Sequence, residues 1–163
     1  ADDQILLLGN KKATLFKRTK KLSDHTLPVG KLINAYVYHK QFYYLTNQAI
    51  YRLDGGKWKE IHKGKNLTAI TFDTQKIFVG TIDGYYAIDI NNGKKVQQIN
   101  NKLPVPMITD MKQVGKQLWF GSDNGAFLKE PDRFRYFAGK RWLDTNHVID
   151  IASDSKGDVY FLT

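Results

Sequence analysis

Five side chains in the second half of the chain have the types and spacing that suit a carbohydrate-binding site. They are Asp83, Asp123, Asn124, Arg141 and Trp142. Carboxylate and amide groups bond to sugar hydroxyls, a guanidinium presents a planar set of donors, and an indole ring stacks on the apolar face of a sugar. We therefore predict that these residues bind a ligand, although Asp83-Gly84 and Asn124-Gly125 are also common pairs in tight turns.

Basic residues interleave with aromatic ones near the C-terminus and cluster again near the N-terminus. The first group is Arg133, Arg135, Lys140 and Arg141 with Phe134, Tyr136, Phe137 and Trp142, and the second is Lys11, Lys12, Lys17, Arg18, Lys20 and Lys21. Cations beside flat rings suit an acidic polysaccharide or a nucleic acid. An outer strand with alternate residues in solvent would give the same pattern over 133–137. Because no recognised nucleic-acid motif accompanies the charge, we do not expect nucleic acid as a partner.

The chain lacks the patterns expected of a metal site or a familiar catalytic centre. Its four histidines are not at a metal-ligand spacing, it has no cysteine, and it has no calcium-binding aspartate loop. It also has no Gly-x-Ser-x-Gly elbow and no glycine-rich phosphate loop. We therefore predict no catalytic residue, no metal and no cofactor. Carboxylates brought together by the fold would still allow catalysis, so an enzyme is kept as an alternative.

Length and composition limit the class of protein. A chain of 163 residues with 42% hydrophobic residues can bury a core without disulfides. Its apolar runs are much shorter than the roughly 20 residues of a membrane-spanning helix, so we expect no span in this chain. The start, Ala1-Asp2-Asp3-Gln4, has no initiator Met and no apolar signal region. We interpret it as the start of a processed or excised chain.

One pattern recurs along the chain, an apolar and aromatic run that usually ends in Thr or Ser. The copies are Phe42-Tyr43-Tyr44-Leu45-Thr46, Ile77-Phe78-Val79-Gly80-Thr81, Leu118-Trp119-Phe120-Gly121-Ser122 and Val159-Tyr160-Phe161-Leu162-Thr163. Their last residues are 35, 41 and 41 positions apart, and a fainter copy covers residues 5–9. An apolar strand and a tight turn precede each run, and two further strands follow most of them. Each unit therefore has four strands in about 40 residues.

This period and strand count predict an all-β fold, a β-propeller built of four-stranded antiparallel blades. A sandwich, a barrel or a solenoid gives no reason for the same four-strand unit to repeat. We expect a single propeller domain or a propeller fragment over 1–163, with units at about 5–28, 32–63, 66–102, 105–142 and, in part, 145–163. The aromatic residues expected to pack between or within the blades are Phe42, Tyr44, Phe78, Trp119, Phe120 and Tyr160.

Residues 103–125, which read LPVPMITDMKQVGKQLWFGSDNG, resemble the two-component regulator propeller repeat. That repeat runs Leu-Pro, a strand, an Asp/Gly turn, Leu-Trp-Phe-Gly-Thr and Gly; residues 143–163 and 66–84 are weaker copies. The resemblance implies an extracytoplasmic sensor propeller of a membrane kinase, of the kind that senses polysaccharide fragments in gut bacteria. Residues 83–94 also resemble the quinoprotein-type propeller repeat, so two propeller families share the signal.

Both ends of the chain fall within a repeat unit. Residues 5–9 align with a second strand, so the first unit lacks its own first strand, and Thr163 aligns with the end of another second strand. About four repeats either close as a small ring, with residues 148–153 beside residues 5–9, or form an arc of a larger ring. In the second case we expect contact with a second propeller chain, or a homodimer, through these mid-blade termini.

The predicted fold would bring the five candidate residues together. Loops between second and third strands, which hold Asp83, Asp123 and Asn124, gather at the same channel mouth as the loops between blades, which hold Arg141 and Trp142. We therefore predict a non-catalytic sensor module that binds an oligosaccharide or acidic polysaccharide outside the cytoplasm. The alternatives are a propeller enzyme, either a quinone-dependent oxidoreductase or a polysaccharide lyase, and a protein-interaction scaffold.

Overall fold

The structure, a computed structural model, describes residues 4–163, all of whose regular elements are β-strands. Ala1–Asp3, interpreted above as the start of a processed chain, lie outside the described residues. Within 4–163 there is no helix that is long and apolar enough to cross a membrane. The all-β prediction is confirmed.

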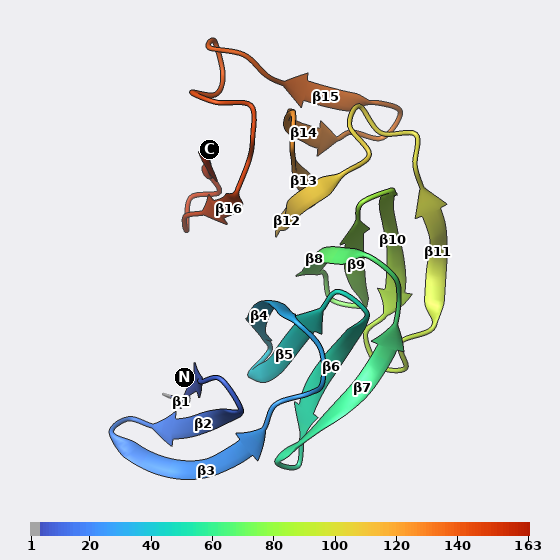
Figure 1. The fold of residues 1–163 in the computed structure, drawn as a ribbon. Helices are drawn as coiled ribbons and strands as arrows, with labels where there is room; N and C mark the ends of the chain where they lie inside the picture. The colour runs from blue at the N-terminus through green and yellow to red at the C-terminus, as the bar shows by residue number, and fades with distance from the viewer. Residues whose placement is uncertain (1–3) are drawn as a thin grey trace. The chain divides into compact units, whose positions relative to one another are not determined.

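The strands form antiparallel sheets in chain order, and the chain divides into two compact units, Ala1–Gly64 and Lys65–Thr163. The first unit contains two sheets (Figure 1). Blade 1 is β1 (Gln4–Leu8), β2 (Lys12–Lys17) and β3 (Lys20–Thr26). Blade 2 is β4 (Leu32–Tyr38), β5 (Gln41–Thr46), β6 (Ala49–Asp54) and β7 (Lys57–Lys63).

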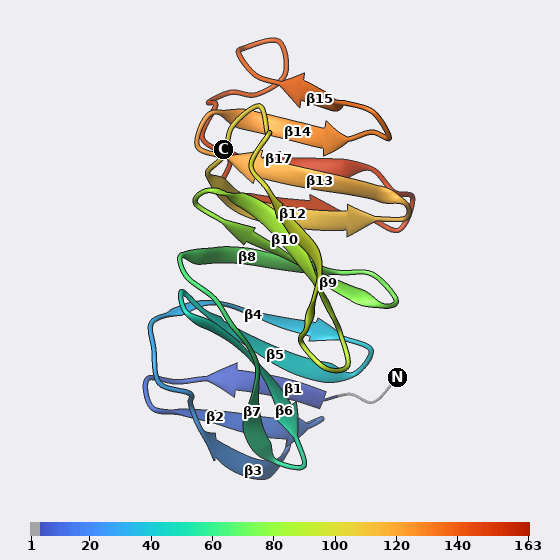
Figure 2. The ribbon, with the colours of Figure 1, turned by 90° about the vertical axis from the view of Figure 1, so that its right-hand side faces the viewer.

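The second unit contains two four-stranded sheets and a two-stranded one (Figure 2). Blade 3 is β8 (Leu67–Phe72), β9 (Lys76–Thr81), β10 (Gly84–Asp89) and β11 (Lys95–Asn100). Blade 4 is β12 (Ile108–Val114), β13 (Gln117–Ser122), β14 (Gly125–Lys129) and β15 (Phe134–Phe137). The terminal hairpin is β16 (Asp150–Ser153) and β17 (Val159–Leu162). The predicted four-strand blades are therefore confirmed, whereas the single-domain organisation and the ring closure stay predictions.

Successive blades of the second unit approach each other closely at a glycine near the end of the second strand. A Cβ on Gly80 would lie 2.8 Å from Ile108 Cγ2, and a Cβ on Gly121 would lie 2.6 Å from Val148 Cγ1. Real Cβ atoms do not come this close to other heavy atoms, so a larger residue would push the next blade outward. The small residue in the repeat pattern marks the place where the next blade begins.

Two apolar clusters hold the second unit together. The cluster between blades 3 and 4 contains Tyr85, Phe120 and Phe127, with Phe78 packed against it. The ring centroids of Tyr85 and Phe120 are 4.8 Å apart. Aromatic pairs at this spacing add to the free energy gained by burying their area.

The cluster between blade 4 and the terminal hairpin contains buried aliphatic residues with Trp119, Phe137, Val159 and Phe161 against them. Of the aromatic residues expected in the core, Phe42, Tyr44 and Phe120 are buried, and Phe78 and Trp119 are partly buried. The prediction for Tyr160 is wrong, because its side chain is 55% exposed. Val159 and Phe161 face the cluster, so alternation along β17 turns Tyr160 to the opposite face.

Asp110 on β12 is a buried carboxylate that contacts the terminal hairpin. Its Oδ2 accepts a hydrogen bond of 2.8 Å from the Ile151 N–H, which also donates to Asp150 Oδ1 at 2.9 Å. Burial raises the pKa of Asp110 to about 7; Asp150 pushes it in the same direction, while the Met111 and Ile151 N–H groups oppose the shift.

Replacing Trp119 with Ala should lower the free energy of unfolding by about 3 kcal/mol, the lower end of the range for Trp because the ring is only partly buried. Tyr160→Ala, at the equivalent position of the next repeat, should cost less than about 1 kcal/mol because that ring is exposed. Urea unfolding followed by circular dichroism measures both changes. Equal losses for the two variants would contradict this packing.

Raising the pH should destabilise the fold between about pH 4 and about pH 7, through Asp110. Over this window the folded chain holds a proton that the unfolded chain has released, so the stabilisation is complete below the window and lost above it. The full shift corresponds to at most about 4 kcal/mol. Asp110→Asn keeps an oxygen acceptor but does not titrate, so urea midpoints of wild type and variant should diverge with pH. Parallel midpoints across the window would rule out the effect.

Candidate ligand-binding surface

The turns that carry the predicted acidic and amide residues share one hydrogen-bonded geometry. In the turn between β9 and β10, Thr81 Oγ1 donates to the Gly84 carbonyl at 2.9 Å and accepts from the Asp83 N–H at 3.1 Å. Ser122 does the same between β13 and β14, at 2.6 Å to the carbonyl three residues later and 3.2 Å from the Asn124 N–H. Both hydroxyl residues are buried. The closing Thr or Ser of the repeat therefore fixes the turn that follows it.

The outer strand β15 covers the turn of blade 4. Gly125 has a φ of 116°, and a Cβ there would lie 2.8 Å from both the Phe137 carbonyl oxygen and the Tyr136 ring. Glycine is needed for both reasons, since other residues rarely adopt this φ and have no room for a Cβ. The Tyr136 hydroxyl donates to the Asn124 carbonyl.

Asn146 joins this turn to the connection that follows β15. Its Nδ2 donates to Asn124 Oδ1 at 3.1 Å, and its carbonyl accepts from the Gly125 N–H at 2.6 Å. Its Oδ1 accepts from the Gly139 N–H at 2.7 Å. Three segments of the chain therefore meet at one amide side chain.

Trp142 lies in the tight turn that begins at Gly139. Its N–H donates to the Gly139 carbonyl at 2.9 Å, while the next residue, Leu143, is buried. The Trp142 ring meets the Phe137 ring edge to face, with centroids 5.2 Å apart, and the Arg141 guanidinium carbon lies 5.1 Å from the ring centroid. The side chain is nevertheless 55% exposed, so part of the indole is held in place and open to solvent.

Contacts connect three of the five predicted site residues. Asn124 is linked through Asn146 and Gly139 to the turn that carries Arg141 and Trp142. Asp123 lies beside Asn124 in the same turn, and Asp83 lies in the equivalent turn of blade 3. We call the following five residues the blade 4 surface: Asn124, Tyr136, Arg141, Trp142 and Asn146.

Two members of the blade 4 surface were not among the predicted site residues. Tyr136 belongs to the basic and aromatic stretch, where alternation indicated only an outer strand. Asn146 lies 22 positions from Asn124, and no motif connects them. The repeat itself offered the remaining signal, since the connection between blades passes near the turn between second and third strands.

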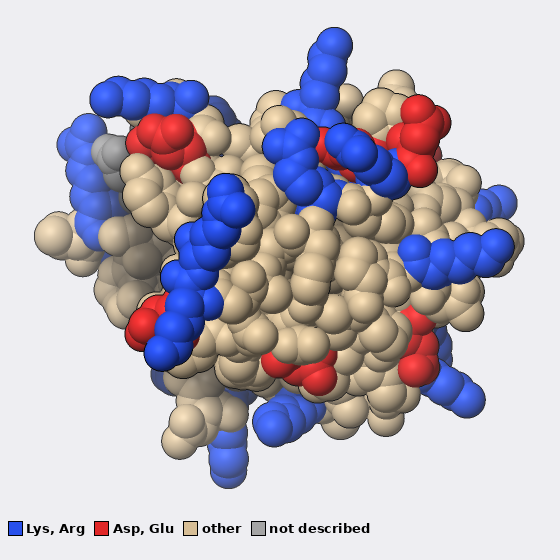
Figure 3. All heavy atoms as spheres, turned by 90° about the horizontal axis from the view of Figure 1, so that it is seen from above, with Lys and Arg blue, Asp and Glu red and all other residues tan. Residues whose placement is uncertain are grey.

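Acidic residues partly neutralise both basic groups. In blade 4, Glu130 accepts from Arg133 Nε at 2.7 Å and from Arg135, and these contacts lower the pKa of Glu130. On the face in Figure 3, Lys and Arg side chains project separately, and Asp or Glu lies beside several of them. The outer-strand interpretation of 133–137 therefore agrees with the position of β15.

The same holds in blade 1, where Asp24 accepts from Lys21 at 2.7 Å, from Thr14 at 2.7 Å and from Lys12 at 3.0 Å. These bonds hold the pKa of Asp24 well below its usual range.

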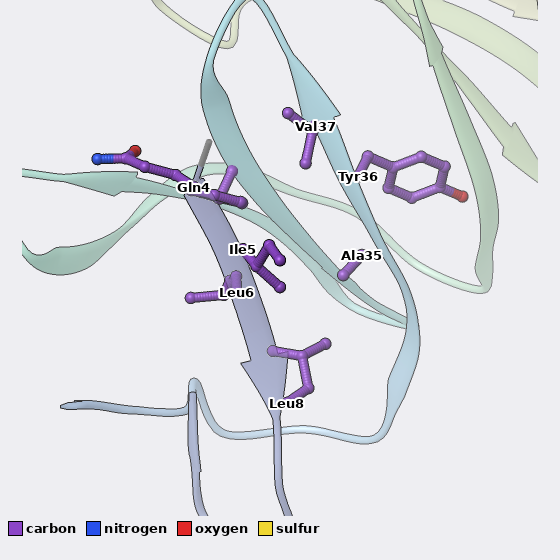
Figure 4. Close-up of a pocket in the computed structure, with 8 residues that line it drawn as sticks. Gln4, Ile5, Leu6, Leu8, Ala35, Tyr36 and Val37 are labelled. Atoms are coloured by element: carbon purple, nitrogen blue, oxygen red, sulfur yellow. The ribbon is translucent and has the colours of Figure 1, made fainter. Parts of the chain in front are cut away.

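An apolar pocket of about 300 Å³ lies in the first unit, between β1 and the first two strands of blade 2 (Figure 4). It is lined by Gln4, Ile5, Leu6, Leu8, Ala35, Tyr36, Val37 and Phe42. None of the predicted site residues lines it. β1 is an edge strand of its sheet in the described part of the chain, whereas the other second strands have a first strand beside them. The pocket therefore lies beside a position that a first strand occupies in the other blades.

No protein-family model matches the chain, and no curated protein matches it in sequence. Its fold is similar to the extracellular domain of the hybrid two-component system BT4673 from B. thetaiotaomicron, with a TM-score of 0.75 and 18% identity over 98% of this chain and 24% of that one. The corresponding domain of BT3049 from the same organism gives 0.67 and 18% over 91% and 23%. The WD40 domain of Neurospora crassa Pan2 gives 0.67 and 15% over 99% and 57%.

These matches establish the fold, which is that of a β-propeller, as the repeat predicted. Two of the three structures are extracellular domains of two-component systems, in agreement with the resemblance of residues 103–125. The chain spans about a quarter of the length of those two domains.

Proposed function

We propose that this chain is a ligand-recognition part of a sensor propeller and that it binds an oligosaccharide or acidic polysaccharide at the blade 4 surface. The observation that carries the proposal is the Trp142 ring, which is anchored on Phe137 yet more than half exposed. Isolated exposed aromatic residues are ordinary, but this one is fixed beside a guanidinium and tied to an amide pair. Aromatic rings with a few convergent polar groups are what a sugar site requires.

The chemistry of the remaining side chains supports a polar, hydroxyl-rich ligand. Asn124 and Asn146 offer amide groups whose mutual hydrogen bond uses one donor and one acceptor and leaves further capacity on each amide. Arg141 adds guanidinium donors that suit hydroxyl, carboxylate or sulfate oxygens. Asp123 extends the same turn with a carboxylate that can accept bonds from sugar hydroxyls. Because backbone bonds hold these segments, binding would require little reordering of the chain.

The sensor role and the location outside the cytoplasm are supported by the fold neighbours and by the repeat sequence. Two of the similar structures are extracellular domains of two-component systems, and the repeat over residues 103–125 resembles the propeller repeat of such regulators. A propeller that binds a glycan outside the cell and passes the event to another domain fits both observations. A propeller enzyme and an interaction scaffold are the competing functions.

Trp142→Ala should weaken glycan binding by roughly 5- to 150-fold, because loss of one ring stack costs about 1–3 kcal/mol. Trp142→Phe should retain a large part of the affinity, since a ring remains. Tyr160→Ala is the matched control, because Tyr160 has the same exposed fraction but lies on the terminal hairpin. A glycan array of neutral and acidic oligosaccharides identifies the ligand, and calorimetry on the best one measures the three variants.

Melting curves of each variant show that the fold is intact. If Trp142→Ala binds as wild type does, the blade 4 surface is not the site. If no glycan binds and the purified chain shows a quinone absorbance band or cleaves an acidic polysaccharide, the enzyme alternative replaces the proposal.

A further inference from the structure

Two sheet faces are apolar and exposed even though the equivalent faces of other blades are covered. On blade 1, Ile5 and Leu7 are 54% and 55% exposed. On the terminal hairpin, Tyr160 and Leu162 are 55% and 58% exposed. Scattered apolar residues on a surface are normal, but these pairs lie at repeat positions that pack between blades elsewhere in the chain.

The second unit shows how the repeat packs one blade on the next. The residue three positions before the closing Thr or Ser points forward, as Trp119 does toward Phe161, with ring centroids 5.7 Å apart. Phe78 occupies the same position in blade 3 and packs against the cluster that contains Leu118 and Phe120. The residues two and four positions before the closing residue therefore receive the aromatic side chain of the preceding blade.

The two exposed faces correspond to the two sides of this contact. Tyr160 occupies the forward position of Trp119, and Leu7 and Ile5 occupy the receiving positions of Phe120 and Leu118. The turn after β1 supports this alignment, because the Gly9 N–H bonds to the Lys12 carbonyl where the other blades have their closing hydroxyl residue. The terminal hairpin therefore offers a forward face, and blade 1 offers a receiving face.

The two faces also differ in the sign of their charge. Residues 4–26 contain six Lys or Arg and a single Asp, whereas residues 150–162 contain three Asp and one Lys. Pairing places Leu7, Thr14 and Asp24 side by side across blade 1, and Lys12 and Lys21 are bonded to that Asp24.

On the terminal hairpin, Ala152 is paired with Tyr160 on the forward face. The Tyr160 hydroxyl donates to Asp154 at 3.3 Å, which places a carboxylate at the edge of that face. Opposite charges around complementary apolar centres favour association of the two surfaces.

We propose that a second copy of this chain docks head to tail, with the Tyr160 face of one copy on the Leu7 face of the other. The contact repeats between chains the packing that Trp119 makes within the chain. It is heterologous, so each copy in a pair keeps one face of each kind unused. Such contacts grow into open chains or close into a ring.

Sedimentation velocity of the full chain over a wide concentration range tests the association. Wild type should show concentration-dependent species larger than a monomer. Tyr160→Asp and Leu7→Asp should each weaken association at least about 30-fold, because an aromatic anchor at the centre of a contact typically carries that much of the affinity. Val29→Asp is the control, since Val29 is 92% exposed and lies outside both faces. A wild type that stays monomeric throughout overturns the proposal, as does normal association of Tyr160→Asp.

Mixing the two defective variants tests the direction of the contact. Tyr160→Asp keeps an intact receiving face and Leu7→Asp keeps an intact forward face, so an equimolar mixture should form a 1:1 dimer and nothing larger. Neither variant alone should do so. A mixture that remains monomeric while wild type associates excludes head-to-tail docking. Thermal melts confirm that both substitutions leave the chain folded.

Discussion

The close contact between the second strand of one blade and the beginning of the next is the constraint on which the second unit depends. It requires glycine at Gly80 and Gly121, because Ile108 and Val148 occupy the space that a Cβ would need. It also places the preceding aromatic residue, Phe78 or Trp119, against the next blade. The hydroxyl residue that follows the glycine then fixes the turn. A short run of residues thus sets the blade spacing, the core packing and the geometry of the turn.

The repeat made most of the fold predictable, because each part of the pattern has a separate physical cause. Strand positions followed from apolar runs between turn residues, and the blade count followed from the period. Burial was harder to predict where a repeat lacks a neighbour. Tyr160 matches Trp119 in the pattern, but the face it points to is uncovered in the described residues, so the pattern alone placed it wrongly in the core.

The candidate surface was predictable only in part. Asp83, Asp123 and Asn124 could be placed in turns because the repeat marks those turns, and Arg141 and Trp142 could be placed in a connection between blades. The contributions of Asn146 and Tyr136 depend on contacts across 22 and 12 positions, respectively, which no local pattern encodes. The exposure of Trp142 likewise depends on how its turn packs on Phe137. Repeats determine where loops gather, whereas the individual loops determine what is bound.

The central claim is that a glycan stacks on Trp142, and the indole N–H signals in a nitrogen–proton NMR spectrum test it most directly. The chain has three Trp residues, so three such signals are expected. The Trp58 Nε1 atom is buried and the Trp119 Nε1 atom donates to Gln117, which distinguishes both from the exposed Trp142. Titration with the glycan selected on the array should move the signal that Trp142→Phe removes, and leave the other two in place. A saturating titration in which the Trp142 signal does not move would contradict the claim.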